Sequence, residues 1–206
     1  MNIIFDLDGT LIDSKLRLYR LFQSLAHSSS FSFDEYWAFK QSKISNETLL
    51  SSKLGYNQSQ IAEFQCQWMA LIESPLYLSL DRSFEGIETV LAGLRQISTL
   101  YVCTARQFRQ PALDQLEKFS LLKYFKQVLV TQQKFSKESL IEANVIGLSS
   151  QDWIVGDTGK DVQVGKFLNI KTCAVLSGFL GQKELMSYGP DLIIESTLDL
   201  PLSDAL

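Results

Sequence analysis

The sequence predicts an α/β protein in which a parallel sheet is interrupted by a helical insertion. The chain has 206 residues, 46% apolar and 20% charged, which is typical of one globular domain, or of one domain with a smaller insertion. After residue 81, short apolar runs alternate with helical patterns, and such alternation favours a parallel sheet covered on both faces. From residue 14 to residue 80 the apolar pattern is helical, with no convincing strand.

The expected strands are short apolar runs that follow turns or helix ends. They lie at residues 2–5, 100–103, 127–130, 153–155, 172–175 and 192–194. Helices are expected between them at 87–94, 137–144 and 161–168, and we expect Pro111 to open a further short helix. This order predicts a Rossmann-like core made of residues 1–13 and 81–206.

The insertion is expected to form a separate helical cap over residues 14–80. Leu16, Tyr19 and Phe22 recur every three residues, and Ile61, Phe64 and Trp68 recur at three and four, which is the spacing of an apolar helix face. Asn57 with Gln60 resembles a capping signal before the second of these helices. A cap that follows the first strand would lie over the carboxyl edge of the sheet, where open α/β sheets bind ligands.

The charge balance and the single histidine exclude some classes of function. The chain has 23 acidic and 19 basic residues, a formal net charge of −4, which argues against nucleic acid as a partner. His27 is the one histidine. A metal site built from several histidines is therefore excluded, and catalysis is expected to rely on carboxylates.

The cysteines and the N-terminus indicate a cytoplasmic protein. Cys66, Cys103 and Cys173 form no CxxC pair and are odd in number, which suits a reducing compartment. The N-terminus has no basic region, and Asp6 interrupts its apolar run, so we expect no signal peptide. No apolar run is long enough to predict a membrane span. A monomer or a homodimer is expected.

Polar clusters follow four of the expected strands. They are Asp6-Leu7-Asp8-Gly9-Thr10-Leu11, Thr104-Ala105-Arg106, Lys134-Phe135-Ser136-Lys137-Glu138 and Gly156-Asp157-Thr158-Gly159-Lys160-Asp161. Each cluster alone has a purely structural explanation, such as a turn, a surface lysine or a helix cap. Because the strands are parallel, however, all four clusters are expected at the same edge of the sheet.

The clusters together predict a magnesium site beside a phosphoryl pocket. The acids at this edge are Asp6, Asp8, Asp157 and Asp161. Carboxylates gathered so closely repel one another unless a cation lies among them, and Mg²⁺ prefers such oxygen ligands. The Thr104 hydroxyl and a lysine beside that cation would neutralise the charge of a phosphoryl group.

These motifs resemble those of the haloacid dehalogenase superfamily. The first cluster, continued by Ile12-Asp13-Ser14, looks like the first motif of its phosphoglycolate phosphatase-like branch. Thr104 matches the second motif, and Gly156–Asp161 resembles the fourth. The segment from Phe84 to Leu94 is similar to the one that leads back from the family's cap, with Glu85 in place of the usual proline.

The third motif is the least regular. Many relatives carry a lysine followed by two prolines, and both prolines are missing here. Lys137-Glu138-Ser139-Leu140-Ile141 resembles the version in which the lysine begins a helix. We therefore expect Lys137 to be the motif lysine, with Lys134 as the alternative.

The resemblance implies a mechanism through an aspartyl-phosphate. Asp6 would be the nucleophile and Asp8 the general acid and base. Mg²⁺ would be held by Asp6, by the backbone carbonyl of Asp8 and by Asp157, with Asp161 supporting the metal less directly. Thr104 and Lys137 would bind the phosphoryl oxygens, and the cap would close over a small phosphorylated metabolite.

Other functions use the same scaffold. A phosphomutase of the β-phosphoglucomutase type has the same residues, so it stays an alternative to a phosphatase. A dehalogenase is disfavoured because it needs neither magnesium nor an acid at position 8, and a non-catalytic binding protein would be expected to lose one of the acids. Lys43, Asn46 and Arg106 are the candidate residues for substrate specificity.

Overall fold

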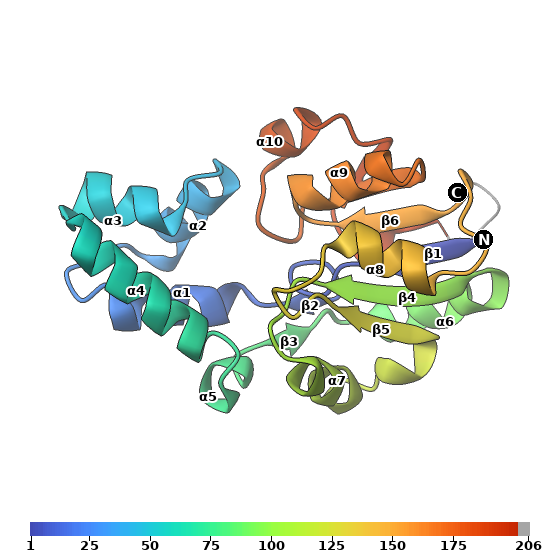
Figure 1. Cartoon of the computed structure of the whole chain (residues 1–206), viewed down its shortest axis with the longest axis horizontal. Helices are drawn as coiled ribbons and strands as arrows, with labels where there is room; N and C mark the ends of the chain where they lie inside the picture. The colour runs from blue at the N-terminus through green and yellow to red at the C-terminus, as the bar shows by residue number, and fades with distance from the viewer. Residues whose placement is uncertain (202–206) are drawn as a thin grey trace.

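The computed structural model describes residues 1–201. Residues 202–206, which belong to the expected core segment 81–206, lie outside the described part. Within residues 1–201, six parallel strands form one sheet in the order β5-β4-β1-β6-β7-β8 (Figure 1). The strands are β1 (Asn2–Phe5), β4 (Thr99–Thr104), β5 (Gln127–Val130), β6 (Trp153–Gly156), β7 (Lys171–Val175) and β8 (Leu192–Ile194). The predicted fold class is therefore confirmed.

The two faces of the sheet are covered by different helices. Side chains alternate along β1, so Ile3 and Phe5 pack into one apolar cluster and Ile4 into another. The first cluster contains residues of α6 (Ile87–Ile97) and α7 (Arg109–Lys118), and the second contains residues of α8 (Lys137–Asn144) and α9 (Gly159–Phe167). Three shorter elements complete the core: η1 (Leu122–Tyr124), α10 (Gln182–Met186) and η2 (Thr197–Asp199).

The helix after β4 begins earlier than expected. We expected Pro111 to open it, but α7 begins at Arg109. Proline is tolerated there because the first N–H groups of a helix have no acceptor within the helix.

The strand register places the carboxyl ends of three strands, which the candidate site residues follow, next to one another. Phe5, the last residue of β1, lies opposite Val102 of β4 and Val155 of β6. Asp6 follows at once, and its N–H donates to the Val155 carbonyl at 2.8 Å. The carboxyl ends of β1, β4 and β6 therefore meet at one edge, where the chain order changes direction.

Five helices form the insertion, which stands apart from the sheet in Figure 1. They are α1 (Lys15–Leu25), α2 (Phe33–Gln41), α3 (Asn46–Leu54), α4 (Gln58–Leu71) and α5 (Pro75–Leu78). Two short strands, β2 (Ile12–Asp13) and β3 (Arg82–Ser83), pair antiparallel at its base. The sequence did not predict these strands, because two residues are too few to show an alternating pattern. We propose residues 14–80 as the cap, because β2 ends just before this segment, β3 begins just after it, and the two strands pair with each other.

The insertion has an apolar core of its own. Phe22 and Leu49 are fully buried there, and Tyr36 nearly so, in a cluster separate from those of the sheet. The Asn57 side chain accepts from the Gln60 N–H, and the Gln60 side chain accepts from the Asn57 N–H, so the expected capping signal is confirmed. No helix within residues 1–201 combines the length and the apolar character needed to cross a membrane.

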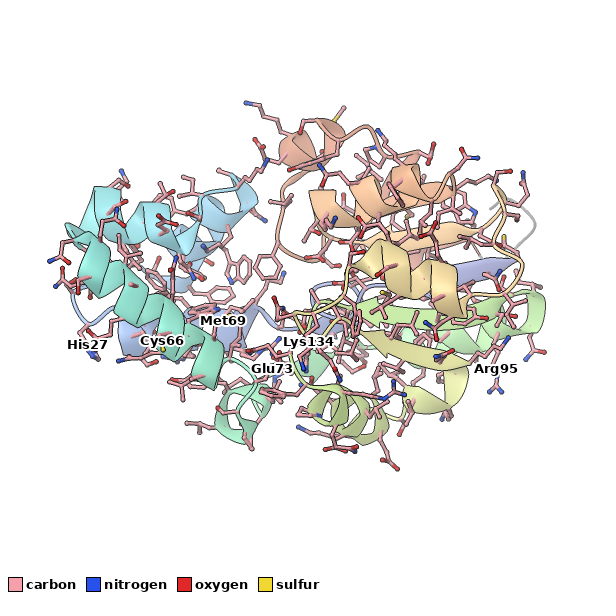
Figure 2. The ribbon with its side chains drawn as sticks, viewed as in Figure 1. His27, Cys66, Met69, Glu73, Arg95 and Lys134 are labelled. Atoms are coloured by element: carbon pink, nitrogen blue, oxygen red, sulfur yellow. The ribbon has the colours of Figure 1, made fainter. Side chains whose placement is uncertain are left out.

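Contacts on two sides hold the insertion against the carboxyl edge of the sheet. The Gly181 N–H donates to the Gln41 carbonyl at 3.0 Å, and the rings of Trp37 and Phe179 lie 5.4 Å apart between centroids. On the other side, the Glu73 carboxylate accepts from the N–H groups that precede α7, at 2.7 and 3.2 Å. Figure 2 shows Glu73 and Met69 at the end of α4 nearest the core and His27 at the far end of the insertion.

Candidate active site

A cavity of about 270 Å³ lies between the carboxyl edge of the sheet and the insertion. The core lines it with five of the residues expected to act in catalysis, phosphate binding or metal binding: Asp6, Asp8, Thr104, Lys137 and Asp157. The insertion adds Arg17 and Leu18 from α1, Met69 from α4, and Ile72 and Glu73 from the segment that follows it. The cavity is therefore lined by both the core and the insertion.

Three buried carboxylates form a cluster at the carboxyl edge of the sheet, and two of them, Asp6 and Asp157, line the cavity. Asp6, Asp157 and Asp161 each offer an oxygen within 4.8 Å of the others. Burial raises the pKa of Asp6 to about 7, although the Lys137 ammonium opposes that rise. Burial, reinforced by the charges of Asp6 and Asp161, raises the pKa of Asp157 well above its ordinary value. The site therefore carries more negative charge than its buried position tolerates easily.

Lys137 is the cation that faces this cluster. Its Nζ lies 2.6 Å from Asp6 Oδ1 and 2.6 Å from Asp161 Oδ1. Burial alone would lower the pKa of Lys137, but the two carboxylates outweigh burial and raise it. Ser136 caps α8 by accepting from the Ser139 N–H, so the lysine begins the helix. Lys134 is instead exposed in the preceding turn and is not among the residues that line the cavity (Figure 2).

Asp157 is held by backbone that approaches it closely. The Phe179 N–H donates to Asp157 Oδ2 at 2.7 Å. A Cβ on Gly178 would lie 2.0 Å from the same oxygen, and one on Gly9 would lie 2.3 Å from it. Gly9 also has φ of +80°, which residues with a side chain rarely adopt. Both glycines are thus needed for Asp157 to occupy this position.

Asp8 points to a different set of partners. Arg106 donates from Nε to Asp8 Oδ2 and from Nη2 to Oδ1, each at 2.8 Å. Arg17 Nη2 donates to the same Oδ1. Burial acts to raise the pKa of Asp8, but the guanidinium groups of Arg106 and Arg17 overcome it and hold that pKa well below its usual range. Asp8 is therefore an ionised carboxylate in this arrangement.

A second carboxylate, Asp81, lies on the other side of the two arginines. Asp81 Oδ1 is 3.1 Å from Arg17 Nε, and Oδ2 is 3.5 Å from Arg106 Nη2. Gln115 Nε2 donates to Asp81 Oδ2 at 2.7 Å. Burial raises the pKa of Asp81 to about 6. The two arginines are thus shared between one acid that faces the cavity and one that is buried behind them.

The three candidate specificity residues are placed differently. Arg106 lines the cavity. Lys43 and Asn46 are not among the residues that line it. The Lys43 ammonium lies 5.0 Å from the centre of the Tyr188 ring, and Asn46 Oδ1 accepts from the Tyr36 hydroxyl at 3.1 Å. In this arrangement both residues make structural contacts away from the cavity.

Sequence reasoning missed Arg17 and Asp81. A usable signal existed for Arg17, because it lies four residues before Leu21 and so shares the apolar face of α1. A charge on such a face indicates a buried partner. Nothing in the pattern around Asp81 distinguishes it from an acid in an exposed turn.

Comparisons with known proteins agree with this geometry. A profile of the haloacid dehalogenase-like hydrolases matches residues 3–175. The pyrophosphatase PpaX of Halalkalibacterium halodurans is 23% identical, over 97% of this chain and 94% of its own length. The phosphoglycolate phosphatase of Synechococcus elongatus is 26% identical, over 96% and 94% respectively. A haloacid dehalogenase-like hydrolase from Streptococcus pneumoniae superposes with a TM-score of 0.78 at 22% identity, over 96% of this chain and 94% of its own.

The profile covers most of the chain and spans the strands and motif residues from which the cavity is built. The chain belongs to the haloacid dehalogenase-like hydrolase family.

Proposed function

We propose that this protein is a Mg²⁺-dependent phosphatase that hydrolyses a small phosphate monoester through an aspartyl-phosphate. The observation that carries the proposal is the juxtaposition of Asp6, Asp157 and Asp161 with Lys137, whose Nζ lies 2.6 Å from Asp6 and from Asp161, at a cavity that Asp6, Asp157 and Lys137 line. A nucleophilic carboxylate, a site for a cation and a fixed ammonium are the parts that phosphoryl transfer requires.

The residues present fit a magnesium ion. All the donors are oxygens, and burial raises the pKa of Asp6 and of Asp157, which supports a cation that would stabilise their ionised forms. Asp6, the backbone carbonyl of Asp8 and Asp157 would hold the ion, and Asp161 would support it less directly. When bound, the ion would neutralise charge on the phosphoryl oxygens.

In the first step, Asp6 attacks phosphorus. A bond forms between an Asp6 oxygen and phosphorus while the bond from phosphorus to the ester oxygen breaks. Thr104 and Lys137 bind the phosphoryl oxygens. Asp8 enters this step protonated, with its contacts to Arg17 and Arg106 loosened, and donates its proton to the leaving alcohol; the second step returns a proton to it. The insertion lines one side of the cavity and would restrict the access of bulk water while the acyl-phosphate exists.

In the second step, Asp8 accepts a proton from water, and that water attacks the phosphorus of the aspartyl-phosphate. Phosphate leaves and Asp6 is restored. Arg17 and Arg106 hold the pKa of Asp8 well below its usual range and make it a weak base, so Asp8 can take this proton only when their contacts with it loosen.

The comparisons do not favour the phosphomutase alternative. The curated relatives that match nearly the whole chain are named as a pyrophosphatase and a phosphoglycolate phosphatase. The non-catalytic alternative is disfavoured too, because every acid that the mechanism requires is present. A cavity of about 270 Å³ is below the usual range for drug-sized ligands, which supports a small phosphorylated metabolite as substrate.

The exposed Lys134 gives a matched control for Lys137. With Mg²⁺ and a panel of small phosphomonoesters, we expect Lys137→Met to lower kcat/KM for phosphate release about 10²- to 10³-fold. Lys134→Met should stay within about twofold of the wild type, because its side chain is exposed. Steady-state phosphate assays on the three proteins make the comparison.

Equal losses in the two variants, or a larger loss in Lys134→Met, would show that Lys137 does not bind the phosphoryl group. Conversion of sugar phosphates that needs a bisphosphate activator, with no net phosphate release, would identify a phosphomutase instead.

A further inference from the structure

Two buried arginines lie on the side of the cavity where the leaving group must be. Arg17 and Arg106 are 2% and 4% exposed, and both line the cavity that holds Asp8. In the proposed function, Asp8 exchanges a proton with the ester oxygen, so the leaving alcohol lies against Asp8. Its nearest atoms then come within reach of the two guanidinium groups that bind Asp8.

The carboxylate of Asp8 is fully engaged by these arginines. Three N–H donors reach its two oxygens, one from Arg17 and two from Arg106. Asp8 can turn to the ester oxygen only if some of these donors find another acceptor, because leaving a buried guanidinium unpaired costs several kcal/mol. The leaving group can provide that acceptor, because it lies within reach of the same guanidinium groups.

The arginines are also held independently of Asp8. Arg17 Nη1 donates to the Ile72 carbonyl at 3.3 Å, and Asp81 lies behind both guanidinium groups. Arg106 Nη1 is buried and has no hydrogen-bond partner within residues 1–201. The two arginines can therefore keep their positions when Asp8 moves, and Arg106 Nη1 is available to donate to a further acceptor.

We propose that Arg17 and Arg106 form a subsite for an anionic group carried by the leaving alcohol of the substrate. The group is a carboxylate or a second phosphoryl group close to the ester oxygen, since planar guanidinium donors bind both in a bidentate manner. This group takes over donors that otherwise hold Asp8. The inference rests on the proposed phosphatase function and specifies its class of substrate.

The test compares substrates that differ mainly in the charge of the leaving group. 2-Phosphoglycolate and inorganic pyrophosphate carry an anionic leaving group, whereas 2-hydroxyethyl phosphate and O-phosphoethanolamine do not. We expect kcat/KM for at least one of the anionic substrates to exceed that for both others by at least about 10-fold. Whether 2-phosphoglycolate or pyrophosphate is preferred distinguishes a carboxylate from a second phosphoryl group.

Arginine variants separate recognition from a merely structural role. Arg17→Gln and Arg106→Gln should each reduce the preference for the anionic substrate by about 10-fold, and Arg106→Lys should recover part of it. Arg95→Gln is the matched control, because Arg95 is exposed on the side of the core away from the insertion (Figure 2). Its substrate preference should equal that of the wild type.

Equal kcat/KM for substrates with and without an anionic leaving group in the wild type would overturn the inference and leave the phosphatase function standing. Losses in the arginine variants that are the same for every substrate would also overturn it. Failure of the wild type to release phosphate from any substrate would overturn the proposed function itself.

Discussion

Replacing Asp6 with asparagine is expected to abolish phosphate release, with a loss of at least about 10⁴-fold in kcat. An amide has nearly the shape of the carboxylate but cannot attack phosphorus and form an acyl-phosphate. Asp6 is buried at the end of β1 and is bound to Lys137, so no other carboxylate can take its place without moving the backbone. Steady-state phosphate release with Mg²⁺ measures the effect.

Asp34→Asn is the matched control for this variant, since Asp34 is exposed on α2 and does not line the cavity. It should retain wild-type activity. An Asp6→Asn protein that is folded by circular dichroism and keeps more than about a hundredth of the wild-type rate would exclude Asp6 as the nucleophile.

Removal of the metal should have the second-largest effect. With EDTA we expect activity to fall at least about 10³-fold and to return when excess Mg²⁺ is added, because the cation supplies several kcal/mol of charge stabilisation in the transition state. Burial, with a contribution from the neighbouring carboxylates, raises the pKa of Asp6 and of Asp157, so an added cation should stabilise their ionised forms. The assay is phosphate release at several Mg²⁺ concentrations.

The Asp157→Asn variant provides a second test of the metal site, one that needs no chelator. Because Asp157 is one of the proposed ligands, this variant should need a higher Mg²⁺ concentration for half-maximal activity. Activity that survives EDTA in the wild type, or an unchanged Mg²⁺ requirement in Asp157→Asn, would contradict the proposed metal site.

The sequence predicted the core well because its elements have strong local signals. The expected strands at residues 2–5 and 127–130 coincide with β1 and β5, and the expected helix at 137–144 coincides with α8. Strand order was not needed to anticipate the site. In a parallel sheet the polar residues after each strand fall at one edge, so Asp6, Thr104 and Asp157 could be expected together.

The surroundings of Asp8 could not be predicted in the same way. Arg17 comes from the insertion, Arg106 from the loop after β4, and Asp81 from the chain that returns to the core. Their meeting depends on how the insertion packs against the core, and no local period encodes that packing. The same limit applies to the Trp37–Phe179 contact, which joins α2 to the loop beside Asp157.

Lys43 and Asn46 are residues that the sequence suggested for substrate specificity but that do not line the cavity. Their position along the chain suggested a segment that reaches the cavity, but Lys43 lies in the turn between α2 and α3 and Asn46 begins α3, and neither side chain is directed into the cavity. Lys43 lies in the left-handed region, with φ of 60°, and faces Tyr188. Position along the chain is therefore a weak guide to which residues of the insertion contact a substrate.

The covalent intermediate on Asp6 is the central claim, and trapping it is the most direct test. The wild type is mixed with Mg²⁺ and p-nitrophenyl phosphate, quenched, reduced with borohydride and analysed by peptide mass spectrometry. Nitrophenolate leaves without a proton from Asp8, so the aspartyl-phosphate should form faster than water removes it. We expect a burst of about one nitrophenolate per protein and homoserine at position 6. Linear release from the start with aspartate 6 intact, or homoserine at another acidic position, would contradict the account.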